Sequence, residues 1–270
     1  MDDTIEQAAE RAITVMRENL GNQVTVDDLA RAAMFSKFYF TRIFQRATGI
    51  SPARFLSALR LERAKELLVS TSLNVAEISI QVGYNSIGTF SARFSRSVGL
   101  SPTAYRRLGG HTTHISTRAH RAIGVPTATV QGVIRPPDGD SGRGVVFTGL
   151  FAERVPEGRP VRCVVLDRPG PYRFHDVPPG AWYLLAQSVP ADCADGLDPD
   201  ELYAAGDAPS VGTEGPIVIR QDSGEQTVDL QLNPVRALDP PVLLALLDAR
   251  KYAMTQVAAQ RADLSCRACA

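Results

Sequence analysis

The chain has 270 residues, which is enough for two domains with hydrophobic cores of their own, and its 29 basic and 29 acidic side chains leave no net charge. No stretch approaches the roughly 18 apolar residues of a membrane span, and residues 1–21 lack the apolar segment of a secretion signal. We therefore expect a cytoplasmic protein without a membrane partner.

The first predicted element is an amphipathic helix over residues 4–20, whose apolar side chains recur at helical spacing. A shorter helix over residues 26–33 follows, with Thr25 as its N-cap. After a brief turn, Ser36 caps another helix over residues 37–47. Two short helices joined by a tight turn are typical of a helix-turn-helix unit.

A longer helix is predicted over residues 52–69, because proline is favoured at a first helical position. The plan then repeats: Asn74 caps a helix over residues 75–82, and Ser86 opens one that extends to about Val98. Internal repetition at a fixed offset, here 50 residues, indicates two copies of one unit. Matching residues are Phe40 and Phe90, Phe44 and Phe94, Arg46 and Arg96, Gly49 and Gly99, Ser51 and Ser101, Pro52 and Pro102, Phe55 and Tyr105.

Three motifs in this region are specific: Arg60-Leu-Glu-Arg-Ala-Lys-Glu-Leu-Leu, then Val75-Ala-Glu-Ile-Ser with Val82-Gly-Tyr-Asn-Ser, and the ending Thr89-Phe-Ser-Ala-Arg-Phe-Ser-Arg-Ser-Val-Gly-Leu-Ser-Pro-Thr-Ala-Tyr-Arg. They resemble the DNA-binding domain of the AraC/XylS family of transcription regulators, over about residues 8–108. In that family, a linking helix holds two recognition helices so that they enter successive major grooves of double-stranded DNA. Two such helices about one turn of DNA apart, ~34 Å, can both meet base edges. The resemblance also implies contact with RNA polymerase.

The outward face of each recognition helix is expected to read the bases. Arg42 suits a bidentate pair with guanine, and Phe38 or Thr41 suits contact with thymine methyl groups. The position of Arg42 is taken in the second helix by Ala92, and Arg93 is turned from it by about 100°. We therefore expect the first helix to carry most direct readout and the second to contact phosphates or thymine methyls. The predicted DNA-binding residues are Ser36, Lys37, Phe38, Thr41, Arg42, Gln45, Ser86, Ile87, Gly88, Ser91, Ala92, Arg93 and Arg96.

The balanced net charge conceals an uneven distribution. Residues 22–110 contain 12 Lys and Arg against 5 Asp and Glu, whereas residues 111–270 contain 15 against 19. Positive charge concentrated in the helical repeat suits a polyanionic partner, although any single arginine could instead solvate a helix surface.

Residues 109–126 are rich in Gly, Thr, His and Arg without periodicity and are predicted to form a linker. His111, His114 and His120 lie in it and suggest a metal hypothesis. Because neither a carboxylate nor a cysteine lies near them in the sequence, we assign no metal site to these histidines.

From residue 127 the pattern changes to a period of two, with turns such as Val177-Pro-Pro-Gly between the apolar runs. Such short strands predict an antiparallel sandwich over residues 127–236. The segment Tyr172-Arg-Phe-His-Asp-Val-Pro-Pro-Gly-Ala-Trp-Tyr-Leu-Leu-Ala looks like the prealbumin-like or carboxypeptidase-regulatory-like sandwich modules, which are mostly non-catalytic. The predicted strands cover residues 127–134, 145–152, 161–166, 172–175, 182–188, 217–219 and 226–232.

The last part is predicted to form a C-terminal helix over residues 237–262, because Asp239-Pro-Pro is a helix start. Its apolar side is expected to be covered, either by docking within the chain or by a second copy in a homodimer. The tail over residues 263–270 contains Cys266 and Cys269, whose spacing suits a redox switch or half of a metal site. We interpret it as a frayed tail, since no second ligand pair is present and the compartment is expected to be reducing.

The fold class is therefore multidomain α plus β: an all-α tandem helix-turn-helix domain over residues 1–108, then an all-β antiparallel sandwich and a C-terminal helix. No nucleophile motif or phosphate-binding glycine loop is present, so we expect neither an enzyme nor a cofactor. Trp182 is predicted to lie in the sandwich core. Two hypotheses for the sandwich stay open: a protein-interaction or dimerisation module, or a sensor of a small-molecule effector with a site around Tyr172, His175 and Tyr183.

Overall fold

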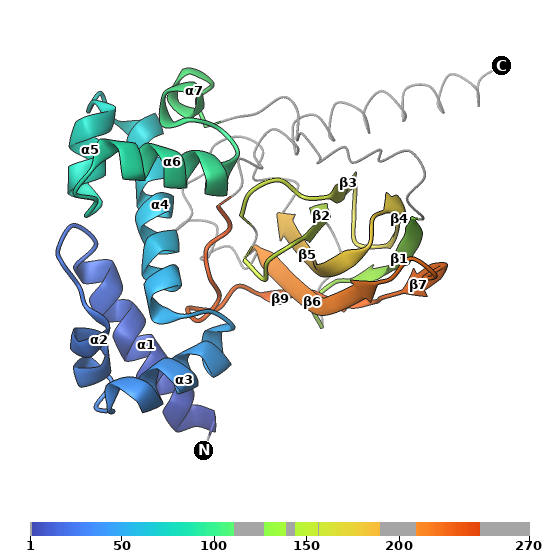
Figure 1. Ribbon diagram of the computed structural model, residues 1–270, viewed down its shortest axis with the longest axis horizontal. Helices are drawn as coiled ribbons and strands as arrows, with labels where there is room; N and C mark the ends of the chain where they lie inside the picture. Colours follow the sequence, from blue (N-terminus) through green and yellow to red (C-terminus); the bar gives the residue numbers. More distant parts are fainter. Residues whose placement is uncertain (1, 111–126, 139–143, 156, 190–208, 244–270) are drawn as a thin grey trace. The chain divides into compact units, whose positions relative to one another are not determined.

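The computed structural model describes residues 2–110, 127–138, 144–155, 157–189 and 209–243. It has helices in the first part of the chain and β-sheets in the second (Figure 1), which confirms the predicted combination of α and β structure. The chain divides into two compact units. The helical unit contains Met1–His111 together with Arg154–Gly158 and Arg236–Ala245, and the sheet unit contains the remainder.

Local signals place the helices close to where the sequence predicts them. The N-caps Thr25 and Asn74 each form a capping box with the acidic residue three positions on. Hydrogen bonds from Thr25 also lower the pKa of the Asp28 carboxyl. The helices of the described residues are α1 (Asp2–Glu18), α2 (Val26–Ala32), α3 (Lys37–Thr48), α4 (Pro52–Ser70), α5 (Val75–Gln81), α6 (Ile87–Val98) and α7 (Pro102–Arg107).

The two copies differ in the length of their turns. Residues 33–36 separate α2 from α3, whereas residues 82–86 separate α5 from α6, one residue more. Asn74 therefore lies 49 positions after Thr25, and the predicted fixed offset of 50 is wrong for the first helix of each copy. The left-handed residue of the first turn is Met34, with φ 62°, although L-residues other than glycine rarely adopt this conformation.

Each copy has a hydrophobic core of its own, and α4 contributes to both. Its Phe55, Leu56 and Leu59 pack with α1, α2 and α3. Further along the same helix, Leu61 and Leu68 pack with the second copy. Figure 1 shows α4 between the group of α1, α2 and α3 and the group of α5, α6 and α7. α4 therefore connects the two copies and contributes buried side chains to both cores.

Two short segments from later in the sequence complete the helical unit. Glu157 accepts hydrogen bonds from Arg54 at 2.7 Å and from the Ser97 hydroxyl at 3.0 Å, so it joins the start of α4 to the end of α6. Leu238 is buried in the first core and Leu243 in the second. Leu243 therefore packs within the chain, against helices of the second copy. Residues 237–243 form no helix, and the rest of the predicted C-terminal helix lies outside the described residues.

Gly83, in the turn between α5 and α6, provides a test of this backbone. Its φ is 82°, and a Cβ there would lie 2.4 Å from the carbonyl oxygen of Leu20. Gly83→Ala is therefore expected to lower the free energy of unfolding by at least about 1–2 kcal/mol, measured by urea unfolding of the full chain. The matched control is Gly88→Ala in the first turn of α6, where the nearest atom to a Cβ is 3.7 Å away. This control is expected to stabilise by up to about 1 kcal/mol, and equal losses in both variants would contradict the turn geometry.

The sheet unit contains two sheets. One has the order β4-β1-β7 with β8 also paired to β1, and the other has the order β3-β2-β5-β6-β9. Both contribute to one hydrophobic core, which includes Val130 and Phe174 from the first sheet and Leu150 and Leu184 from the second. The strands are β1 (Ala128–Arg135), β2 (Val145–Phe151), β3 (Arg162–Leu166), β4 (Pro171–Val177), β5 (Gly180–Val189), β6 (Ser210–Ile219), β7 (Glu225–Thr227), β8 (Leu230–Gln231) and β9 (Asn233–Pro234).

The structure corrects three features of the predicted sheets. Both β7 and β8 run parallel to β1, so the first sheet is mixed and the wholly antiparallel prediction is wrong. The predicted strand over residues 217–219 is the end of β6, whose Gly212 and Gly215 give the earlier residues the composition of a turn. Third, the single strand predicted over residues 226–232 is divided into two short strands, β7 and β8.

Candidate nucleic-acid interface

The outward side of α3 is formed by the residues that its core does not use. Phe40, Ile43, Phe44 and Thr48 face inward, because they recur at the spacing of one side of a helix. The predicted residues Ser36, Lys37, Phe38, Arg42 and Gln45 are exposed, and Thr41 is half-buried.

The start of α3 presents apolar side chains to solvent. Phe38 is 89% exposed and Met34, in the preceding turn, is 80% exposed. Neither contributes to the first core. Large exposed apolar side chains that adjoin a charged helix suit a partner with apolar groups of its own, such as thymine methyls.

The polar side chains of this face are partly ordered by neighbours. The guanidinium carbon of Arg42 lies 5.4 Å from the ring centre of Tyr39, within the range of a cation–π contact. The Lys37 ammonium pairs with Asp27 at 2.7 Å, and the Thr41 hydroxyl donates to the carbonyl oxygen of Lys37. The contact with Tyr39 restricts the Arg42 side chain before DNA binds, which reduces the side-chain entropy lost on binding.

The corresponding face of α6 is smaller and less polar. Ser86 accepts a cap hydrogen bond from the Thr89 N–H, and Ile87 is 49% exposed. Gly88, Ala92 and Arg96 are exposed, and Ser91 is half-buried. Of the seven predicted positions on α6 and its cap, only Arg96 carries an exposed charged side chain, so the outward faces of α3 and α6 present different chemistry.

Arg93 was predicted to bind DNA although it is turned away from the position of Ala92. It is half-buried, and its Nε has no hydrogen-bond partner although the atom is buried. Its position follows Phe90 by three residues and precedes Ser97 by four, so it borders the inward side of α6. A buried donor without an acceptor costs free energy, so Arg93 is less suited to free contact with a phosphate than Arg96.

Arg46 was missed in the predicted set. It is exposed in the last turn of α3, and the repeat already matches it with Arg96, which the prediction included. Tyr39 was also left out, although its ring supports Arg42. Comparing the two copies position by position would have identified Arg46.

The residues predicted for an effector site do not come together. Tyr172 is buried in the sheet core, and its hydroxyl donates to the carbonyl oxygen of Val228 at 2.7 Å. His175 is exposed on the other face of β4, while Tyr183 lies in β5 of the other sheet. Trp182 was predicted to lie in the sandwich core. It is half-buried and packs against that core, and its indole N–H donates to the carbonyl oxygen of Pro178.

The linker histidines and the tail cysteines Cys266 and Cys269 lie outside the described residues. Cys163 lies in β3, where burial raises the pKa of its thiol to about 11 and leaves it protonated at neutral pH. Across residues 2–110 and the described parts of the sheet unit, no three His, Cys, Asp or Glu side chains gather as metal ligands would. In the same residues, no helix combines the length and apolar character of a membrane span.

Comparison with known proteins extends these observations. A family model described as a helix-turn-helix domain matches residues 29–108. The lactose operon transcription activator of Staphylococcus xylosus is 29% identical over 104 residues, which are 38% of this chain and 37% of that protein. The transposon Tn10 TetD protein of Escherichia coli is 33% identical over 92 residues, which are 34% of this chain and 67% of that protein.

A solved structure gives a similar match. It is the C-terminal domain of AraT, a response regulator from Geobacillus stearothermophilus, with 31% identity, a TM-score of 0.37, and coverage of 43% of this chain and 94% of that one. This chain spans little more than a third of the length of the Staphylococcus relative. The match to the family model ends at residue 108, so the resemblance of the sheet unit to prealbumin-like modules stays a prediction.

Proposed function

This chain belongs to the AraC/XylS family of transcription regulators, and we propose that it is a regulator that binds specific DNA sequences with α3 and α6. The observation that supports this proposal most directly is the exposed face of α3. Phe38 and Arg42 are exposed and four positions apart on this helix, and together they suit the methyl group of thymine and the acceptor edge of guanine.

We infer that α2 with α3 and α5 with α6 are two helix-turn-helix units held by α4. Each pair has a capped first helix, a tight turn and a second helix ended by a left-handed glycine. α4 packs into the cores of both copies and would hold the two readers close enough to bind one stretch of DNA together. In this proposal, α3 and α6 enter major grooves about one turn of DNA apart.

The two readers are proposed to contribute unequally. The charged and aromatic face of α3 would carry the direct base readout, whereas the smaller face of α6 would contact thymine methyls through Ile87 and phosphates through Arg96. Residues 22–110 contain 12 basic and 5 acidic side chains, and the resulting positive charge would attract DNA of any sequence.

For the sheet unit we propose a role in assembly. The separation of Tyr172, His175 and Tyr183 removes the reason for placing an effector site among them. A sandwich of two sheets that offers one face to a second copy would join two DNA-binding units. The alternative is a passive module that contacts another protein.

The test is selection from random double-stranded DNA by the purified full chain at about 0.15 M salt. The full chain is used because residues 154–158 and 236–243 complete the helical unit. The expected result is a motif with two patches about 10 base pairs apart, the patch of α3 being better defined. A doubled motif would support assembly through the sheet unit. No enriched sequence, or a single patch, would contradict the two-reader proposal.

A further inference from the structure

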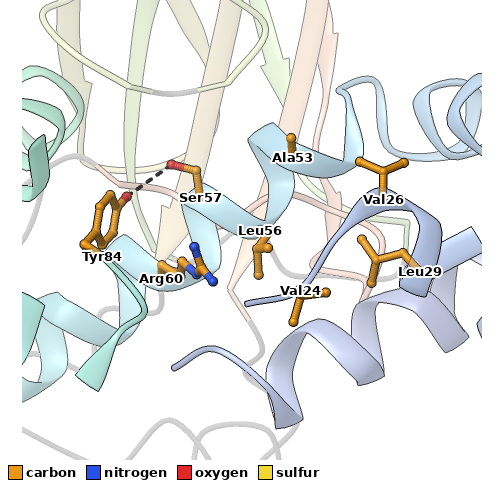
Figure 2. A pocket seen from close by; sticks show the side chains of 8 residues that line it. All are labelled: Val24, Val26, Leu29, Ala53, Leu56, Ser57, Arg60 and Tyr84. Atoms are coloured by element: carbon orange, nitrogen blue, oxygen red, sulfur yellow. Dashed lines mark hydrogen bonds between the residues drawn. The ribbon is translucent and has the colours of Figure 1, made fainter. Parts of the chain in front are cut away.

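The helical unit contains a half-open cleft of about 230 Å³ between the two copies (Figure 2). Val24, Val26 and Leu29 of the first copy form one side, and Leu56 of α4 lies opposite. Tyr84, in the turn of the second copy, closes one end. The cleft is therefore lined by both copies and by the helix that connects them.

The two ends of the cleft differ in chemistry. Figure 2 shows the aliphatic side chains of Val24, Val26 and Leu29 at one end, with Ser57, Arg60 and Tyr84 at the other. The hydroxyls of Ser57 and Tyr84 are 3.3 Å apart and share one hydrogen bond. Only one of the two hydroxyls donates in that bond, so the other hydroxyl can donate a hydrogen bond to a ligand.

Arg60 gives the polar end a positive charge. Its Nε and Nη2 donate to the carbonyl oxygens of Leu20 and Asn22 at 3.0 and 2.7 Å, which leaves further N–H groups of the guanidinium. Both acceptors are neutral, and no carboxylate of the described residues forms an ion pair with Arg60. Partial burial lowers the pKa of Arg60, but the guanidinium stays protonated. An anion bound in the cleft would therefore compensate this positive charge.

We propose that this cleft binds a small monocarboxylic acid with an aliphatic chain, and that the bound acid changes the affinity of the protein for DNA. The carboxylate would accept hydrogen bonds from Arg60 and from the free hydroxyl proton, and the chain would lie against Val24, Leu29 and Leu56. At ~30 Å³ per water-sized group, the 230 Å³ of the cleft hold about eight non-hydrogen atoms, the size of hexanoate.

The effect on DNA rests on the proposed function, because it requires α3 and α6 to bind together. An acid in the cleft touches the first copy, α4 and the turn that precedes α6. It would favour one relative position of the two copies and so change the fit of the second helix once the first is bound. Coupling between two sites on one protein is typically five-fold or more in affinity.

The test of the site is an NMR titration of the full chain with hexanoate, following the methyl groups of valine and leucine. The expected result is that resonances of Val24, Leu29 and Leu56 shift and saturate. Hexan-1-ol has the same length without charge, and acetate has the charge without the chain. Both are expected to leave these resonances nearly unchanged. Equal shifts with hexan-1-ol, or none with hexanoate, would overturn the proposal.

Variants identify the groups that hold the acid. Arg60→Gln is expected to weaken hexanoate binding at least ten-fold, whereas Arg63→Gln, an exposed change on the same helix, is expected to have no effect. Arg60 also supports the chain at Leu20, so its loss can disturb folding. Ser57→Ala with Tyr84→Phe keeps every carbon of the fold and is expected to weaken binding about five-fold. Unchanged binding in this double variant would overturn the site.

DNA binding is measured separately, with the enriched sequence from the selection. Hexanoate is expected to change the Kd of the full chain for that sequence about five-fold or more, and the double variant is expected to need about five-fold more hexanoate for the same change. Saturable binding with an unchanged Kd would overturn the regulatory part alone. If no DNA sequence is enriched, the proposed function fails, while the methyl titration still decides whether the site exists.

Discussion

Replacing Phe94 by alanine is expected to cost about 3–5 kcal/mol of the free energy of unfolding of the helical unit. The side chain is fully buried in the second core, 5.6 Å by ring centres from Phe90 and from Tyr105. A cavity at this position removes contacts with both rings, and the surrounding helices can relax only in part. The measurement is denaturant unfolding of the full chain followed by circular dichroism at about 222 nm, which reports helices.

The chain contains its own controls for this experiment. Phe38→Ala removes the same side chain from an 89% exposed position of α3 and is expected to change stability by no more than about 0.5 kcal/mol. Trp182 is the single tryptophan and lies in the sheet unit, so its fluorescence follows the other half of the protein. A loss below about 1 kcal/mol for Phe94→Ala, or an equal loss for Phe38→Ala, would contradict the described packing.

Arg42→Ala is expected to weaken binding to the enriched DNA sequence by about 1–3 kcal/mol and to relax the base preference at one position of the α3 patch. The reason is that a bidentate contact of arginine with guanine distinguishes that base from the other three. The measurement is the Kd for the enriched sequence and for its single-base variants at fixed salt. A loss of the same size on every sequence would show that Arg42 contacts phosphate only.

Two further variants separate base readout from phosphate contact. Arg96→Ala is expected to weaken binding evenly across sequences and to reduce the slope of log K against log salt by about 1. Ala92→Arg gives α6 the residue that α3 has at the matching position. It is expected to create a base preference in the α6 patch, and no such preference would mean that α6 does not present this position to the bases.

Most of the helical unit follows from local sequence. The caps Thr25 and Asn74, the proline that begins α4 and the left-handed Gly49 and Gly99 are signals that act within one turn of the chain. They predicted the helix boundaries to within a few residues because the hydrogen bonds involved join neighbours. The extra residue in the turn before α6 was missed, since the aromatic repeat that defined the offset begins only after that turn.

The sheets depended on contacts that local sequence does not contain. A period of two predicted where most strands lie, but strand direction depends on which distant segment supplies the partner. The parallel pairing of β7 and β8 with β1 joins residues 96 positions apart, such as Thr129 and Glu225, and has no local signature. Likewise, β6 is paired with β5 through residues whose glycines and proline suggest a turn.

The candidate sites show the same division. The sequence by itself determined the repeat, the outward residues of α3 and the substitution of Ala92 for an arginine, because helical periodicity assigns a face to every residue. Only the tertiary structure decided that Arg93 is half-buried and that Tyr172 and His175 lie on opposite faces of β4. It also decided that Arg60 and Tyr84 meet Val24 around one cleft. These features depend on which side chains far apart in the chain come within contact distance, and a one-dimensional pattern carries no information about those distances.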